Sequence, residues 1–80
     1  DVALMVVDGL AGITPDDAHF ARWLRRFDKP VVLAVNKAES KRAAPTMADA
    51  YQLGLGEPVA ISAEHGEGLA ELYDALAAHE

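Results

Sequence analysis

The sequence lacks cysteine, long apolar runs and any excess of positive charge, and each absence excludes a class of protein. Without cysteine there is no disulfide and no thiolate metal site, which fits a reducing compartment. No apolar run approaches the ~18 residues that a transmembrane helix needs, and no signal peptide is visible, so no membrane contact is expected. Seven basic residues against 13 acidic ones give a net charge of −6, which argues against a general binder of phosphate backbones.

The composition that remains is ordinary for a small globular domain, with 51% apolar and 25% charged residues. The 80 residues suffice for one domain at most. Its core is thin, because a chain of this size buries roughly 60–65% of the surface that its unfolded form exposes. The sequence begins at Asp1 rather than methionine and enters a strand-like run at once, so we expect a piece of a longer protein.

Strand-like and helix-like segments alternate along the chain. Continuous apolar runs are typical of strands buried on both faces of a parallel sheet, whereas apolar residues spaced by three and four indicate helices. The expected strands cover residues 2–8, 30–36 and 57–62. The expected helices run from 15 to about 27, from about 47 to 53, and from about 67 to 78.

Capping residues mark the ends of these helices. Thr14 is a suitable N-cap for the first helix. Thr46 and Asp49 have the spacing of a capping box, which predicts that the second helix starts near Met47. Gly54 is expected to end that helix.

The resulting β-α-β-α-β-α order predicts an α/β fold. Strands that alternate with helices form parallel sheets through right-handed crossovers, so we expect three strands in sequential order and helices on both faces, in three layers. In such sheets, ligands bind beyond the carboxyl ends of the strands. That rule places residues 8–9, 36–40 and 62–66 on one rim.

Polar groups suited to a guanine base follow the second strand, in the stretch "VVLAVNKAES". Asn36 offers donors and an acceptor, and the carboxylate of Glu39 can accept both adjacent donors of guanine, its ring N1–H and its exocyclic amine. Adenine has no donor at the matching ring nitrogen and carries its amine elsewhere. Lys37 can lay its aliphatic stem along the ring while its ammonium stays in water.

A second polar group, Ser62-Ala63-Glu64, follows the third strand. Ala63 is small enough to let the backbone approach a ligand, and its N–H can donate to the guanine oxygen O6. Either motif alone can be an ordinary polar turn. Together, at the ends of successive strands of one sheet, they describe one base-binding pocket.

The two motifs resemble guanine-recognition motifs of small GTPases of the translation-factor class: "NKAE" is similar to the fourth and "SAE" to the fifth. "VVDGLAGITPDD" resembles the segment after the second switch in the TrmE–Era–Der group. "LGLGEPVAISAEHGEGL" is similar to the first G domain of the Der (EngA) family. The resemblance covers essentially all 80 residues and implies the carboxyl-terminal half of a G domain of the P-loop NTPase type.

The resemblance implies a role for each residue of the pocket. Asn36 ties the loops together and touches the base, Lys37 packs over the base, and Glu39 takes the carboxylate position. Ser62 steadies Glu39 or the loop. Ala63 donates its N–H to the base oxygen. Glu39 stands where aspartate is usual, so its longer side chain must retract or the loop must shift.

The resemblance also implies GTP or GDP as ligand, a cytoplasmic location, and a longer parent that hydrolyses GTP and acts on the large ribosomal subunit during its assembly. Neither the phosphate-binding G-x-x-x-x-G-K-S loop nor the D-x-x-G switch occurs in these 80 residues, and the threonine that holds magnesium is also missing. Phosphoryl transfer depends on those parts. We therefore expect Mg²⁺ only in the intact parent, and no hydrolysis by this chain alone.

Two other interpretations remain open. The chain can be an interaction segment that binds no nucleotide, or a small receiver-like regulatory module in which Asp8 would be the functional acid. His65 is expected to be an ordinary exposed loop residue. Trp23 and Phe27 are expected to pack in or half in the core rather than line a partner groove.

The apolar strand at Val2 to Val7 is expected to have an open edge if no upstream strand pairs with it. Unpaired N–H and C=O groups on such an edge are a template for pairing with another chain. We therefore expect self-association through this strand, or cover from upstream residues. Ala3→Pro is expected to block pairing at this edge if the N–H of Ala3 faces outward.

Overall fold

The computed structural model describes residues 2–79 and confirms the expected α/β fold. The elements in chain order are β1 (Ala3–Asp8), α1 (Pro15–Leu24), β2 (Val31–Asn36), the 3₁₀ turn η1 (Lys41–Ala43), α2 (Ala44–Tyr51), β3 (Val59–Ala60) and α3 (Leu69–Ala77). All strand pairs are parallel, and the strands lie in the sequential order β1-β2-β3.

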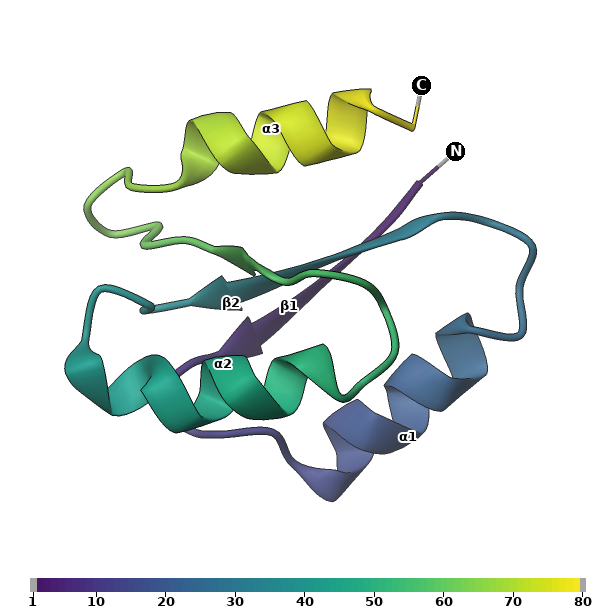
Figure 1. Ribbon diagram of the computed structural model, residues 1–80, viewed down its shortest axis with the longest axis horizontal. Helices are drawn as coiled ribbons and strands as arrows, with labels where there is room; N and C mark the ends of the chain where they lie inside the picture. Colours follow the sequence, from purple (N-terminus) through teal and green to yellow (C-terminus); the bar gives the residue numbers. More distant parts are fainter. Residues whose placement is uncertain (1, 80) are drawn as a thin grey trace.

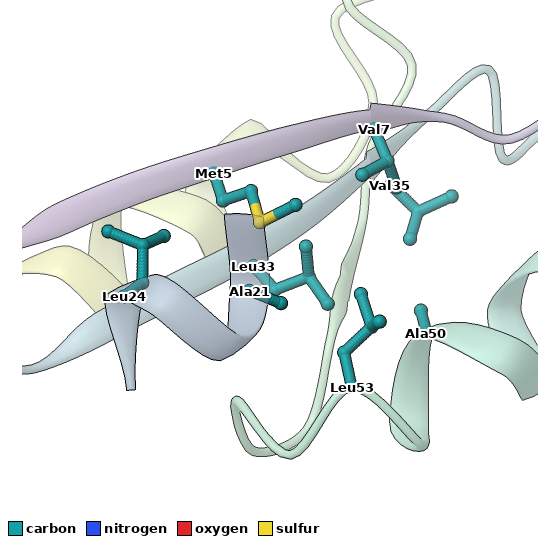
Figure 2. Close-up of a cluster of buried hydrophobic side chains, with 8 residues drawn as sticks. All are labelled: Met5, Val7, Ala21, Leu24, Leu33, Val35, Ala50 and Leu53. Atoms are coloured by element: carbon teal, nitrogen blue, oxygen red, sulfur yellow. The ribbon is translucent and has the colours of Figure 1, made fainter. Parts of the chain in front are cut away.

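The sheet lies between two layers of helices, as expected (Figure 1). α1 and α2 cover one face, and α3 covers part of the other. Figure 2 shows the larger core cluster, in which strand residues meet both helices of the first face: Met5, Val7, Ala21, Leu24, Leu33, Val35, Ala50 and Leu53. The smaller cluster, on the α3 face, consists of Val32, Ala34, Ile61 and Leu72.

α1 begins as predicted and ends three residues earlier. Thr14 is its N-cap, and its side chain accepts from the N–H of Asp17 while the Asp17 carboxylate accepts from the N–H of Thr14. The regular helix ends at Leu24. The N–H groups of Arg26 and Phe27 then bond to carbonyls three residues back, which tightens the last turn out of α-helical geometry.

The prediction that Thr46 caps α2 is wrong. α2 starts at Ala44, directly after η1, and Ser40 is the residue whose side chain caps that turn, through the N–H of Arg42 at 3.2 Å. Thr46 lies inside the helix and is buried, and its Oγ1 donates to the carbonyl oxygen of Gly9. A tertiary hydrogen bond therefore occupies the hydroxyl that the local pattern assigned to a cap.

β3 is shorter than expected, and α3 starts later. β3 covers Val59–Ala60 rather than 57–62, although the N–H of Ile61 still bonds to the carbonyl of Val35 at 2.9 Å. α3 begins at Leu69 because Gly68, with φ 77°, is its left-handed N-cap residue. A side chain at Gly68 would collide with the carbonyl of Ala60.

β1 is an edge strand among the described residues, because it pairs with β2 alone. Met5 and Val7 are buried under α1 and α2, whereas Leu4 and Val6 on the opposite face are 44% and 52% exposed. α3 packs over β2 and β3 and leaves this part of the sheet uncovered.

Trp23 in α1 and Phe27, which follows the helix, are half-buried, as expected. Their ring centroids lie 4.6 Å apart in an edge-on arrangement. Phe20 also stacks on Trp23, with the centroids 5.5 Å apart. None of the helices within residues 2–79 is long and apolar enough to cross a bilayer.

Candidate functional site

The carboxyl ends of the strands meet at one rim, as the fold predicts. The N–H of Gly9, just after β1, donates to the carbonyl of Asn36 at the end of β2 at 2.8 Å. The N–H of Ala38 donates to the carbonyl of Ile61, just after β3, at 3.0 Å. Only glycine fits at position 9, because a Cβ there would lie 2.7 Å from the carbonyl oxygen of Asn36.

Asn36 joins the two polar loops of the rim. Its Oδ1 accepts from the N–H of Lys37 at 2.9 Å and from the N–H of Ala63 at 3.0 Å. One side-chain oxygen thus fixes the start of the NKAE loop and the SAE loop at once. Its Nδ2 has no hydrogen-bond partner among the described residues, so two N–H donors remain for a ligand.

Lys37 has an unusual backbone conformation and a charged partner. Its φ is 62°, the only positive φ outside glycine within residues 2–79. A residue other than glycine in this region costs of order 1 kcal/mol, and such strain is concentrated at functional sites. Its Nζ lies 3.1 Å from Oδ2 of Asp8, across the rim from the end of β1.

Asp8 is held by the turn that follows β1. Its Oδ1 accepts from the N–H of Leu10 at 2.8 Å and from the N–H of Ala11 at 3.3 Å. The hydrogen bonds from the Leu10 amide and the Lys37 ammonium lower the pKa of Asp8, because they stabilise the ionised carboxylate. Asp8 was placed on the rim from the sequence, but the pattern gave no reason to connect it with Lys37.

The carboxylate of Glu39 lies beside a histidine of the third rim loop. Its Oε2 is 3.8 Å from Nε2 of His65, which is a loose contact rather than a hydrogen bond. Both side chains remain partly exposed, so the carboxylate is accessible to a ligand. His65 is exposed as predicted, but the sequence did not indicate its position next to Glu39.

The SAE loop is closed by its backbone. Ser62 and Glu67 exchange N–H to carbonyl bonds of 2.9 and 3.1 Å. Ser62 is 2% exposed, and its hydroxyl has no hydrogen-bond partner within the described part of the chain. The N–H of Ala63 is engaged by Asn36, so donation to a base oxygen requires that this N–H be shared or exchanged. Glu64 is exposed at the loop surface.

Shallow hollows lie at the opposite ends of the strands. One of about 330 Å³ and one of about 170 Å³ share Leu24, Phe27, Lys29 and Val31 in their linings. Lys29 lines both hollows and Arg25 lines the larger one, but neither lining contains a carboxylate, whereas the rim carries Asp8 and Glu39. Among residues 2–79 no group of three histidine, cysteine or acidic side chains is arranged to hold a metal ion.

Several curated proteins with the name GTPase Der share most of this sequence. The chain is 55% identical to GTPase Der of Novosphingobium aromaticivorans over 76 residues, which is 95% of the chain and 16% of that protein. It is 56% identical to the Rhodopseudomonas palustris protein over 78 residues, 98% of the chain and 17% of that protein. The Brucella anthropi protein is 58% identical over 76 residues, which is again 95% of the chain and 16% of that protein. The chain spans about one sixth of the length of these relatives, and no protein-family model matches it.

Proposed function

We propose that this chain, which is homologous to a segment of GTPase Der, forms the guanine-recognition half of a G domain. The homology confirms the family resemblance in the sequence. The observation that carries the functional proposal is the position of Asn36, whose Oδ1 joins both motif loops at the carboxyl ends of parallel strands. Loops held in this way present their remaining polar groups to one ligand.

The remaining groups match the edges of guanine. The free Nδ2 of Asn36 can donate to the acceptor nitrogen N7, and the accessible carboxylate of Glu39 can accept from N1–H and the exocyclic amine. The stem of Lys37 supplies an apolar surface for the ring. Ser62, Ala63 and Glu64 form the loop on the far side of Asn36, where O6 of the base is proposed to lie.

Phosphate and Mg²⁺ are proposed to bind to other parts of a longer parent. The G-x-x-x-x-G-K-S loop is absent from the sequence. We therefore expect GTP hydrolysis only from the parent, and none in a phosphate-release assay on the chain alone. Turnover by the pure chain that Asn36→Ala abolishes would contradict this assignment.

The wider role rests on the resemblance to the Der family. We propose that the parent is cytoplasmic and acts on the large ribosomal subunit during its assembly. The receiver-like alternative has less support, because the homologous proteins are named as GTPases and Asp8 is engaged by Lys37 and two backbone amides. A ligand titration distinguishes the proposed site from the second alternative, an interaction segment that binds no nucleotide.

The test is an NMR titration of the ¹⁵N-labelled chain with guanosine, with adenosine as the matched ligand control. Guanosine should shift the amide signals of Lys37, Glu39 and Ala63, and adenosine should not. Asn36→Ala should remove the guanosine response, while Asp74→Ala on the exposed side of α3 should retain it. Equal responses to both nucleosides, or none to either, would contradict base recognition by this chain.

A further inference from the structure

Asp8 lies opposite Lys37 on the rim, and the sequence gives it no role in base binding. The Oδ2 atom of Asp8 lies 3.1 Å from Nζ of Lys37, and the two residues are 29 positions apart in the chain. We propose that Asp8 is a positioning residue of the guanine site, which holds the Lys37 side chain where the base packs. This inference rests on the proposed function.

The carboxylate of Asp8 is suited to this role because it cannot rotate freely. Oδ1 is occupied by the N–H groups of Leu10 and Ala11, so Oδ2 is the oxygen left to face Lys37. β1 and β2 bring the two residues together, since Asp8 is in register with Asn36, the residue before Lys37. The position of the anion is therefore fixed by the sheet and by the turn after β1.

Lys37 is held at both ends. Asn36 accepts from its backbone N–H, and Asp8 accepts from its ammonium. Its backbone keeps a positive φ of 62°, a conformation that persists only where the surroundings impose it. With both ends held, the four-carbon stem has fewer conformations to lose when a purine ring packs against it, which favours binding.

A purely structural role for Asp8 is the competing explanation, because its carboxylate also closes the turn at Leu10 and Ala11. Asp8→Asn separates the two roles. The asparagine oxygen can keep both turn hydrogen bonds, but the negative charge that attracts Lys37 is lost. Exposed ion pairs contribute little, so the expected loss of guanosine affinity is about two- to fivefold.

The experiment measures guanosine dissociation constants by NMR for the wild-type chain, Asp8→Asn, Lys37→Met and the double variant. Asp74→Asn, at an exposed site on α3, is the control with the same change in net charge. Asp8→Asn should weaken binding in the wild-type background and have no further effect beside Lys37→Met. Asp74→Asn should bind as the wild type does. Equal affinity of Asp8→Asn and wild type, or an equal loss in both backgrounds, would overturn the inference.

A second readout needs no ligand. The ¹³Cε and ¹Hε signals of Lys37 should change on Asp8→Asn, with the unfolding temperature at neutral pH lowered only slightly. Unchanged Lys37 signals would overturn the inference even if guanosine binds. A different result separates the two proposals: the Lys37 signals change on Asp8→Asn, but the wild-type chain does not bind guanosine. This result would contradict the proposed function, and with it the role of Asp8 at a base.

Discussion

Oγ1 of Thr46 in α2 donates to the carbonyl oxygen of Gly9 at 2.7 Å, and this buried hydrogen bond joins α2 to the turn that follows β1. Gly9 also donates its N–H to the carbonyl of Asn36. One residue without a side chain thus connects three elements directly beneath the rim. The rim is therefore supported by tertiary hydrogen bonds as well as by the strands themselves.

Replacing Thr46 with valine tests this support. Valine has nearly the same shape but no hydroxyl, so the buried carbonyl of Gly9 would lose its side-chain donor. We expect the free energy of unfolding to fall by about 1–3 kcal/mol, measured by urea denaturation. Thr46→Ser keeps the hydroxyl and should lower the free energy of unfolding by less, through the loss of a buried methyl group alone. An unchanged free energy of unfolding in Thr46→Val would show that the hydrogen bond contributes nothing.

Replacing Ser62 with alanine should have the opposite effect on the free energy of unfolding. The buried Ser62 hydroxyl has no partner among the described residues, so Ser62→Ala removes an unsatisfied polar group. We expect stability to be unchanged or raised by up to about 1 kcal/mol. Ser40→Ala is the matched control, because the Ser40 hydroxyl caps η1, and its loss should lower stability. A large destabilisation by Ser62→Ala would indicate a partner that the structure does not show.

The pH dependence of stability should report the charge of Asp8. The hydrogen bonds from the Leu10 amide and from Lys37 hold the pKa of Asp8 below its ordinary value in the folded chain. Because the folded pKa is lowered, ionised Asp8 stabilises the fold fully above the pKa of the unfolded chain. This contribution is lost as the pH falls through the folded pKa. The unfolding temperatures of the wild type and Asp8→Asn should therefore differ near neutral pH and converge at low pH. A difference that stays constant with pH would contradict this.

Self-association through β1 remains a proposal, and the structure corrects the substitution that tests it. The N–H of Ala3 faces inward and donates to the carbonyl of Pro30 at 3.0 Å, so Ala3→Pro would break the sheet rather than block its edge. Because N–H groups alternate along a strand, the N–H of Leu4 faces the open edge. Leu4→Pro is therefore the appropriate variant, and it also reduces the exposed apolar surface.

In sedimentation at high concentration, the wild type should associate and Leu4→Pro should be monomeric with its fold retained. Ala3→Pro serves as the control and should lower stability, because it removes a hydrogen bond between β1 and the residue before β2. A wild-type chain that stays a well-folded monomer with this edge in solvent would show that the edge does not mediate self-association.

Local patterns in the sequence predicted the features that depend on neighbouring residues. The apolar runs identified β1 and β2, and the cap at Thr14 followed from residues within one turn of it. The strand order and the common rim followed from general rules of α/β folds. The pairing of Asn36 with the SAE loop was expected from the family resemblance, and the hydrogen bond to Ala63 agrees with it.

The features that the sequence missed depend on residues far apart in the chain. Thr46 matches a capping pattern, but its partner Gly9 is 37 residues away and is brought near only by folding. The pairing of Asp8 with Lys37 and the inward direction of the Ala3 N–H both depend on the register of β1 against β2. No local pattern contains that register, because it is set by how the whole sheet packs.

The most direct test of guanine recognition is the ratio of inosine to guanosine dissociation constants. Inosine lacks only the exocyclic amine that the Glu39 carboxylate is proposed to accept from. The wild-type chain should bind guanosine more tightly by about fivefold or more, as expected for the loss of one partner of a paired hydrogen bond. Glu39→Ala should bring the ratio of the inosine to the guanosine dissociation constant close to one. Glu64→Ala, on the exposed part of the SAE loop, should change this ratio less. The same preference for guanosine in the wild type and in Glu39→Ala would contradict the proposed site.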